Sequence, residues 1–332
     1  MSYADKLFIE NCHRIISVGD SDEKFEVRPK WEDGTPAHTV KNLYVVDRYQ
    51  LSQTSIPIMT MRKTAFKSCI DEILWIYQKA SNKIEDLNSH IWDEWNVGDG
   101  TIGKAYGYQM SLLHRHHRYR RGENWDGYAT IREKDGWVYM NQFDAVIWDL
   151  KHNPGSRSIM TNLYNHHDLS EMGLRPCAYS MTFNVTKDGA GNMVLNGMLN
   201  QRSQDMLVAN NWNTVQYSVL LHMLAQVCGM QVGTFVHIIA DAHIYDRHIP
   251  VVKDMITRYA EIEKKWIIEN GEERYREISA IPWLMDKEDI PHKNPKFWIN
   301  PEVTDFYQFT TKDFALEGYE YEPFDMKIPV AV

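Results

Sequence analysis

Hydrophobic and polar residues follow two different spacings along the chain, and each predicts a kind of element. Between residues 65 and 80, apolar side chains recur every three to four positions, at Phe66, Ile70, Ile73, Leu74 and Tyr77. This spacing places them on one face of an amphipathic helix. Glu72 lies off the centre of that apolar stripe, so the pattern alone favours an exposed helix carboxylate there.

A two-residue period begins after Cys177 and indicates strands. In residues 179–185 every second side chain is apolar, which predicts a strand with one buried face. Residues 192–203 are predicted to be its hairpin partner, because the turn-forming segment KDGAGN separates the two. The same patterns predict further strands over 40–52 and 231–240, helices over 4–18 and 214–228, and a loop rich in turn formers over 28–39.

Strands and helices occur without strict strand–helix–strand alternation, which predicts an α+β fold. The 332 residues contain no internal repeat and no low-complexity linker, so residues 1–332 are interpreted as a single domain. Two segments have the character of insertions into a compact core. Residues 112–138 are basic and then mixed in charge, and residues 255–292 predict a charged helix.

The net charge of −9 argues against a general nucleic-acid binder. One basic stretch, HRHHRYRR at residues 114–121, departs from that balance. No aromatic platform or known binding fold surrounds it, so it is interpreted as a solvated, mobile loop.

The cysteines narrow the chemistry that Cys177 can perform. Cys12, Cys69, Cys177 and Cys228 lie far apart and form no CxxC pair, so the paired spacing of a zinc site is missing and no metal is expected. The N-terminus is too polar for a signal peptide and no apolar run approaches ~18 residues, so a cytoplasmic protein with no membrane span is expected. A reducing compartment argues against a disulfide. Cys177 remains either a small buried hydrophobe or a nucleophile.

Several motifs occur together in one order around this cysteine. RPCAYSMTFNV, LNQRSQDMLVANNWNTVQY and FVHIIADAHIYDRH follow the upstream segments DEILW, HIWDEW and GKAYGYQ, and the chain ends in KIPVAV. This set resembles the folate-dependent, cysteine-nucleophile thymidylate synthase family from about residue 28 to residue 332, outside the two insertions. The resemblance implies a thymidylate synthase-like fold with a large mixed β-sheet flanked by helices, assembled as a homodimer.

The resemblance also implies an activity: methylation of dUMP to dTMP, with 5,10-methylenetetrahydrofolate as donor of the carbon and the hydride. Cys177 resembles the nucleophile that adds to carbon 6 of uracil and so activates carbon 5. Glu72 resembles the general acid/base that works through water, and Tyr106 the tyrosine whose water network helps remove the carbon 5 proton.

Substrate contacts are implied in the same way. Arg28, Arg202 and Ser203 resemble groups that bind the nucleotide phosphate, and Arg157 resembles an arginine that reaches across from the partner subunit. His243 and Tyr245 resemble the pair that hydrogen-bonds the sugar 3′-hydroxyl.

Asn213 resembles the residue that selects the base, because its amide both donates to and accepts from uracil. An Asp at this position would favour cytosine nucleotides. From the sequence, Asn213 is also interpreted as the N-cap of the helix over 214–228.

The folate contacts implied by the resemblance are Trp92, Trp95, Asp205, which would bind the pterin ring as part of the catalytic site, and Val332 at the end of a closing tail. Two departures stand out. Ser158 stands where the family usually has the second of two adjacent arginines. Ala178 stands where the family usually has His, and some bacterial and phage members also lack that His.

Two other functions fit these residues. A dUMP hydroxymethylase, or less readily a dCMP hydroxymethylase, would share the thiolate addition but finish with water. A non-catalytic dimer could instead use the basic stretch at 114–121 to hold RNA.

Overall fold

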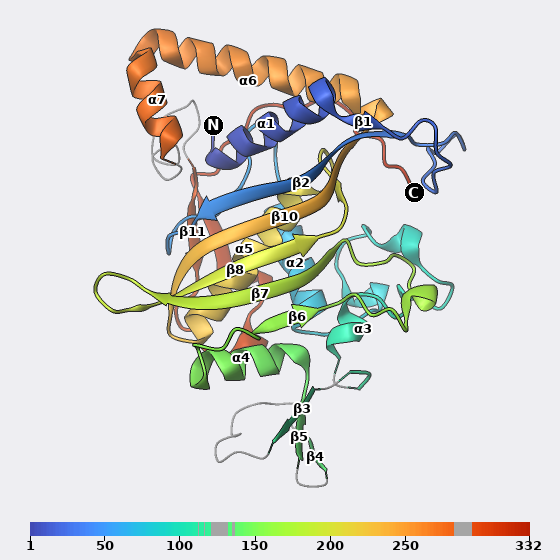
Figure 1. Cartoon of the computed structure of the whole chain (residues 1–332), viewed down its shortest axis with the longest axis vertical. Coiled ribbons are helices and arrows are strands. Elements are labelled where there is room, and N and C mark those ends of the chain that lie inside the picture. The colour runs from blue at the N-terminus through green and yellow to red at the C-terminus, as the bar shows by residue number, and fades with distance from the viewer. Residues whose placement is uncertain (112, 116, 121–131, 135–136, 282–293) are drawn as a thin grey trace.

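A mixed sheet forms the centre of the computed structural model (Figure 1), which describes residues 1–111, 113–115, 117–120, 132–134, 137–281 and 294–332. The seven-stranded sheet has the order β1-β2-β10-β8-β7-β6, with β9 paired to β10. Only the contacts of β10 with β8 and β9 are parallel, so the sheet is mixed and the α+β prediction is confirmed. Its strands are β1 (Asp20–Ser21), β2 (Thr39–Gln50), β6 (Met160–Asn162), β7 (Ala178–Lys187), β8 (Met193–Gln201), β9 (Gln204–Asp205) and β10 (Gln231–Tyr245).

Two helices cover one face of this sheet and form the core with it. In Figure 1, α2 (Phe66–Tyr77) and α5 (Asn210–Val227) lie behind the strands. Almost every side chain of α5 is buried. Its polar residues tolerate this position because they are hydrogen-bonded: Thr214 and Ser218 donate to helix carbonyls one turn back, and His222 contacts the Ser55 carbonyl.

The remaining elements surround this core. They include α1 (Tyr3–Val18), α3 (Gly107–Met110), α4 (Gln142–His152), α6 (Ile249–Asn270), α7 (Glu272–Ala280), and the hairpin of β11 (Lys296–Ile299) with β12 (Phe314–Glu317). Short 3₁₀ turns are η1 (Ile84–Asp86), η2 (Asp93–Trp95), η3 (Leu169–Glu171), η4 (Asp246–His248), η5 (Phe306–Gln308) and η6 (Thr311–Asp313). Over the described residues, no helix combines the length and apolar character needed to cross a membrane.

The helices over 4–18 and 65–80 and the strands over 40–52, 179–185, 192–203 and 231–240 are confirmed as elements, with shifted ends. The strand predicted over 231–240 continues as β10 to Tyr245. It continues because β2 pairs with it along its whole second half. His243 and Tyr245 therefore lie on a strand.

Three predictions from the sequence are corrected. The helix predicted over 214–228 begins at Asn210, and its N-cap is Ala209, so Asn213 lies inside the first turn and is not the cap. Within the basic stretch, β3 (His117–Arg120) pairs with β5 (Trp137–Met140), which also pairs with β4 (Arg132–Lys134), so these residues are a strand and not a loop. The charged segment over 255–292 contains two helices, α6 and α7, separated at Gly271, whereas residues 282–293 lie outside the described residues.

Candidate functional site

The pairing of β7 with β8 brings Cys177 and Arg202 together. Ala178 pairs with Gln201 across the hairpin, so the residue before one strand meets the residue after the other. The Arg202 backbone N–H donates to the Cys177 carbonyl at 2.9 Å, and Arg202 Nη2 lies 3.5 Å from Cys177 Sγ. A cationic group thus contacts the thiol.

Arg202 is held in this position by carbonyl oxygens. Its Nε donates to the Pro176 carbonyl at 3.0 Å and its Nη2 donates to the Arg175 carbonyl at 2.7 Å. These bonds fix one edge of the planar guanidinium. Its orientation beside the thiol is therefore set by the backbone around the cysteine.

The Cys177 thiol is half-buried, and burial raises its pKa above the ordinary value of 9.0. The positive charges of Arg202 and then Arg28 act in the opposite direction. Arg28 is exposed on the loop between β1 and β2. Its charge acts on the pKa of Cys177, so this loop lies within electrostatic range of the cysteine although it is distant in sequence.

Glu72 is buried, which corrects the expectation of an exposed carboxylate. Trp92 Nε1 donates to Glu72 Oε1 at 2.7 Å, and Gln216 Nε2 donates to Oε2 at 2.7 Å. Trp212 Nε1 also donates to Oε2. All three donors are uncharged, so burial prevails and raises the pKa of Glu72 above its ordinary value of 4.5.

Tyr106 lies between these two groups. Its hydroxyl accepts a hydrogen bond from the Cys177 N–H at 3.0 Å, and its ring packs edge-on against Trp92 with centroids 5.0 Å apart. Tyr106 has a positive φ of 45°. The next residue, Gly107, packs so closely against Ser81 that a Cβ there would lie 2.0 Å from the Ser81 carbonyl oxygen.

Trp95 also lies close to this cluster. Its ring meets that of Trp92 edge-on with centroids 5.4 Å apart, and its Nε1 is buried without a hydrogen-bond partner. An unsatisfied indole N–H can donate to a polar group of a ligand.

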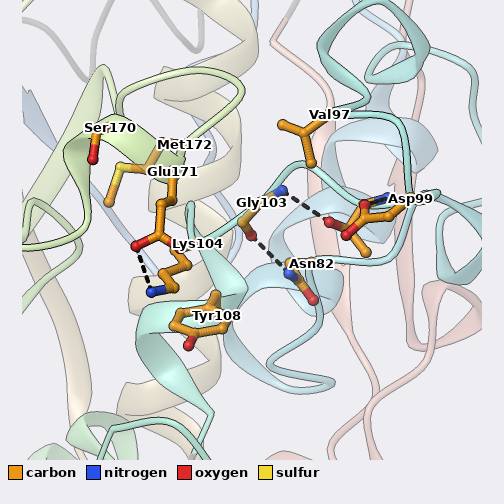
Figure 2. A pocket seen from close by; sticks show the side chains of 10 residues that line it. Asn82, Val97, Asp99, Gly103, Lys104, Tyr108, Ser170, Glu171 and Met172 are labelled. Atoms are coloured by element: carbon orange, nitrogen blue, oxygen red, sulfur yellow. Dashed lines mark hydrogen bonds and ion pairs between the residues drawn. The ribbon is translucent and has the colours of Figure 1, made fainter.

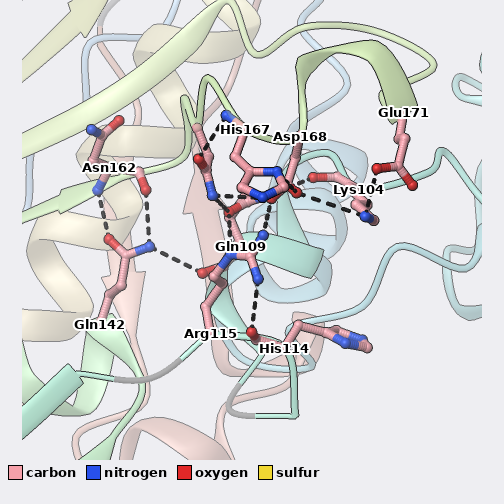
Figure 3. A network of polar contacts seen from close by, with 10 residues as sticks. Lys104, Gln109, His114, Arg115, Gln142, Asn162, His167, Asp168 and Glu171 are labelled. Atoms are coloured by element: carbon pink, nitrogen blue, oxygen red, sulfur yellow. Dashed lines mark hydrogen bonds and ion pairs between the residues drawn. The ribbon is translucent and has the colours of Figure 1, made fainter.

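A polar network anchors the segment that carries Tyr106 to the segment that leads to Cys177 (Figure 3). Asp168 accepts hydrogen bonds from Gln109 at 2.8 Å and Asn165 at 3.0 Å, and it forms an ion pair with Arg115. Burial acts to raise the pKa of Asp168, but these hydrogen bonds and the charges of Arg115 and Lys104 hold it below its ordinary value of 3.8.

A surface cleft of about 430 Å³ lies beside this network (Figure 2). Lys104 and Glu171 meet across it at 2.6 Å, and Asn82 donates to the Gly103 carbonyl at 2.6 Å. The lining residues include none of the predicted site residues. These contacts connect neighbouring loops, so we interpret the cleft as a feature of the support around the site.

The C-terminal tail lies against the loop that carries Arg28, and Figure 1 shows the C-terminus beside that loop. The Val332 N–H donates to the Lys30 carbonyl at 3.0 Å, and the Lys30 N–H donates to the Val332 carbonyl at 2.8 Å. His248, a residue missed by the sequence analysis, contacts the Pro329 carbonyl at 2.7 Å through Nε2. Tail and loop therefore form one unit at the edge of the site.

Asp205 lies next to His248. Its Oδ1 accepts the N–H groups of Leu207 and Val208, each at 3.0 Å, and lies 3.7 Å from His248 Nδ1. The carboxylate is half-buried, so it faces both the protein and solvent.

His243 and Tyr245 occupy neighbouring positions on one face of β10, with ring centroids 5.2 Å apart. His243 Nδ1 contacts Asp241 Oδ1 at 2.9 Å, and Asp241 forms an ion pair with Lys41 at 3.0 Å. Arg28 acts electrostatically on the Tyr245 hydroxyl, whose pKa is raised by burial. Arg28 therefore lies within electrostatic range of Tyr245 at the end of β10.

Asn213 and Ser203 are half-buried, and they are joined through Gln201. Gln201 Nε2 donates to the Ser203 carbonyl at 3.0 Å and to Asn213 Oδ1 at 3.1 Å. Arg157, in contrast, is exposed before the edge strand β6, and no contact among the described residues joins it to Cys177. The structure therefore joins Cys177 to Arg202, Tyr106 and, through Trp92, to Glu72, whereas Arg157 has no such contact within the part of one chain that the structure describes.

Besides His248, the sequence analysis missed four polar residues at this site: Gln201, Trp212, Gln216 and His237. Two of them had a readable signal. Trp212 is adjacent to Asn213 and Gln216 follows it by three positions, so on a helix they neighbour the predicted base-selecting residue. Their shared contact with Glu72 depends on the packing of α2 against α5.

A half-buried cysteine beside an arginine, with a tyrosine between it and a buried carboxyl group, is the arrangement expected of an enzyme with a cysteine nucleophile. The thymidylate synthase family model matches residues 6–283 of this chain. The chain therefore belongs to the thymidylate synthase family, whose members are methyltransferases that use methylenetetrahydrofolate as co-substrate, and the resemblance predicted from the sequence is confirmed.

Individual relatives agree with that assignment. Thymidylate synthase from Bacillus licheniformis is 36% identical over 325 residues, which cover 97% of this chain and 96% of the relative. Thymidylate synthase from Bacillus phage phi3T is 37% identical with the same coverage. The solved structure of thermostable thymidylate synthase A from Bacillus subtilis matches with a TM-score of 0.74 and 36% identity, covering 99% of both chains.

Proposed function

We propose that this protein catalyses the reductive methylation of dUMP to dTMP, with 5,10-methylenetetrahydrofolate as donor of both the carbon and the hydride. The observation that carries the proposal is the 3.5 Å contact of Cys177 Sγ with Arg202 Nη2 in a chain of this family. That contact sets positive charge against burial, which raises the pKa of the thiol.

Cys177 adds to carbon 6 of the uracil ring. This addition converts the ring to an enolate, so carbon 5 can attack the one-carbon unit of the folate. Arg202 and Arg28 stabilise the thiolate before the addition. The folate then supplies the hydride, so the scheme needs no separate reductant and no metal.

Glu72 and Tyr106 serve the proton transfers. The raised pKa of Glu72 brings it nearer to neutral pH, where a carboxyl group can both take up and release a proton. Tyr106 contacts the backbone of the nucleophile, so its hydroxyl is close to the carbon that must lose a proton.

Arg28, Arg202 and Ser203 bind the nucleotide phosphate, together with Arg157 from a second copy of the chain. His243 and Tyr245 hold the sugar hydroxyl, and the Asn213 amide pairs with the uracil. Supporting this arrangement, the positive charge of Arg28 acts on the pKa of both Cys177 and Tyr245, so Arg28 lies within electrostatic range of these two side chains.

A homodimer forms through the sheet face opposite α5. On that face β2 leaves Val46 60% exposed and β6 leaves Met160 45% exposed. Large apolar side chains in such a position favour burial against a second copy. Arg157 precedes β6 by three residues, at the margin of this face.

The folate binds among Trp92, Trp95 and Asp205, and the tail that ends at Val332 closes over it. The unsatisfied Trp95 Nε1 and the half-buried Asp205 carboxylate supply polar groups for the ligand. Exclusion of water by the tail protects the intermediate and favours methyl over hydroxymethyl product.

We also propose a single catalytic domain over residues 1–332, with residues 112–138 and 255–292 as insertions, and a cytoplasmic location. One continuous hydrophobic cluster supports the single domain. The four cysteines are free thiols, which suits a reducing compartment.

The deciding experiment mixes purified protein with carbon-5-tritiated dUMP and methylenetetrahydrofolate. Tritium release and the dihydrofolate absorbance are followed together. We expect the amount of tritium released to equal the amount of dihydrofolate formed. Tritium release without dihydrofolate would replace this proposal by a hydroxymethylase, and the absence of both signals beside an active control enzyme would overturn it.

A further inference from the structure

Asn213 lies between two glutamines that use opposite ends of its amide. Gln201 Nε2 donates to Asn213 Oδ1 at 3.1 Å. Asn213 Nδ2 donates to Gln216 Oε1 at 3.0 Å. One glutamine therefore acts on Asn213 as a donor and the other as an acceptor.

Each glutamine is itself held in one orientation by a group that accepts hydrogen bonds. Gln201 Nε2 also donates to the Ser203 carbonyl at 3.0 Å, and Gln201 Oε1 contacts His237 Nε2 at 2.8 Å. Burial lowers the pKa of His237 to about 3, so the ring is neutral at physiological pH. Gln216 Nε2 donates to Glu72 Oε2 at 2.7 Å.

These hydrogen bonds form one row of side chains, and the orientation of Gln216 is fixed most firmly at the Glu72 end. Two indole N–H groups, which can only donate, also point at the carboxyl oxygens. If Gln216 turned over, its carbonyl oxygen would face Glu72 Oε2 in place of its N–H. The hydrogen bonds thus run in a single direction, from His237 through Gln201, Asn213 and Gln216 to Glu72.

This direction matters because the two pyrimidines present opposite patterns. Uracil offers a donor at N3 and an acceptor at O4, whereas cytosine offers an acceptor at N3 and a donor at N4. An amide that turns over freely matches either base. The hydrogen bonds to Gln201 and Gln216 use one lone pair and one N–H of Asn213, which leaves one of each for a base.

We propose that Gln216 is a positioning residue that determines specificity, because it locks the Asn213 amide in the orientation that pairs with uracil and rejects cytosine. Glu72 sets the lock by fixing Gln216. The inference rests on the proposed function for the identity of the nucleotide. It adds that one side chain, Gln216, is hydrogen-bonded both to Asn213, which recognises the base, and to Glu72, the acid/base carboxyl group.

The test measures dUMP and dCMP binding by calorimetry without folate, in wild type and in Gln216→Met. Methionine keeps the length of the side chain but removes both hydrogen bonds. We expect the ratio of dUMP to dCMP affinity to fall by about tenfold, since the hydrogen bond that orients the Asn213 amide is among those lost. Gln226→Met is the matched control. Gln226 lies in the same helix and donates to the carbonyls of Asn300 and Val303, far along the chain from Asn213. The control should keep the wild-type ratio.

Gln216→Glu separates orientation from packing. Its carboxyl group can accept from Asn213 and, when protonated, donate to Glu72, so it should retain the preference for dUMP that Gln216→Met loses. If Gln216→Met does not fold by circular dichroism, Gln216→Ala takes its place, because it removes the same groups with a smaller side chain.

An unchanged affinity ratio in the folded Met or Ala variant would overturn the lock, and so would a loss of preference in Gln216→Glu equal to that in Gln216→Met. A wild-type protein that binds dUMP no better than dCMP would defeat both the lock and the proposed function. A wild type that prefers dUMP but makes no dTMP would contradict the proposed function alone.

Discussion

Two buried carboxyl groups in this molecule have opposite electrostatics. Glu72, at the site, is 6% exposed and Asp168, in the loop before Cys177, is 1% exposed. The donors around Glu72 are two indoles and an amide, whereas Asp168 has Arg115 and Lys104 beside it. The pKa of Glu72 is raised by burial, and that of Asp168 is lowered against it.

The difference shows that two carboxyl groups with similarly low solvent exposure can have pKa values shifted in opposite directions. Neutral donors satisfy the oxygens of Glu72 without stabilising its charge as strongly as a cation would, so the group can exchange a proton. Cations keep Asp168 ionised, so it can act as a permanent acceptor that joins loops. We therefore propose that Glu72 transfers the proton and that Asp168 supports the site.

The largest effect is expected from Glu72→Gln. Glutamine keeps the volume and one acceptor oxygen but cannot transfer a proton as a carboxyl group does. We expect kcat to fall by about 10²–10⁴-fold in the dihydrofolate absorbance assay. Asp71→Asn is the matched control, because Asp71 is the adjacent buried acid on α2 and contacts Asn88 instead. Equal losses of kcat in the two variants would contradict a role in proton transfer that Glu72 has and Asp71 lacks.

Asp168→Ala should act on stability. The substitution leaves Gln109, Asn165 and Arg115 without their shared acceptor, which costs about 2 kcal/mol of unfolding free energy. Urea unfolding measures it, with Asp188→Ala in the exposed β7–β8 turn as the control. A kcat loss as large as that of Glu72→Gln, with unchanged stability, would contradict the supporting role.

The smallest expected effect is on the pH dependence of the free energy of unfolding, to which Glu72 and Asp168 should contribute with opposite slopes. The folded state raises the pKa of Glu72, so its contribution to the free energy of unfolding falls as pH rises above the ordinary value of 4.5. The folded state lowers the pKa of Asp168, so its contribution is present above 3.8 and is lost as pH falls through the folded pKa.

Urea unfolding of wild type, Glu72→Gln and Asp168→Asn between pH 3 and pH 8 tests both signs. The difference from wild type should slope in opposite directions for the two variants. Slopes of the same sign would show that the two carboxyl groups do not differ as described.

The sequence predicted most elements because their signal is local. The apolar period of residues 65–80 and the alternation after Cys177 each describe one face of one element. The family motifs predicted which residues surround the cysteine, and the β7–β8 register explains why Cys177 and Arg202 meet.

The environment of Glu72 could not be predicted in this way. Its position beside the apolar stripe of α2 favoured exposure, but α5 packs over it and brings Trp212 and Gln216 into contact. The same packing explains the error at Asn213. A side chain interpreted as a cap lies inside a helix whose start extends to Asn210 because Asn210 and Asn211 are buried there.

By itself, the sequence determined the order of most elements, the α+β class and the family, because period, motif and residue type are local properties. Only the tertiary structure decided which carboxyl group has a raised pKa, which way the Asn213 amide points and where the tail lies. Those outcomes depend on burial and on hydrogen bonds between residues far apart in the chain. Glu72 and Gln216 are separated by 144 positions and meet at 2.7 Å.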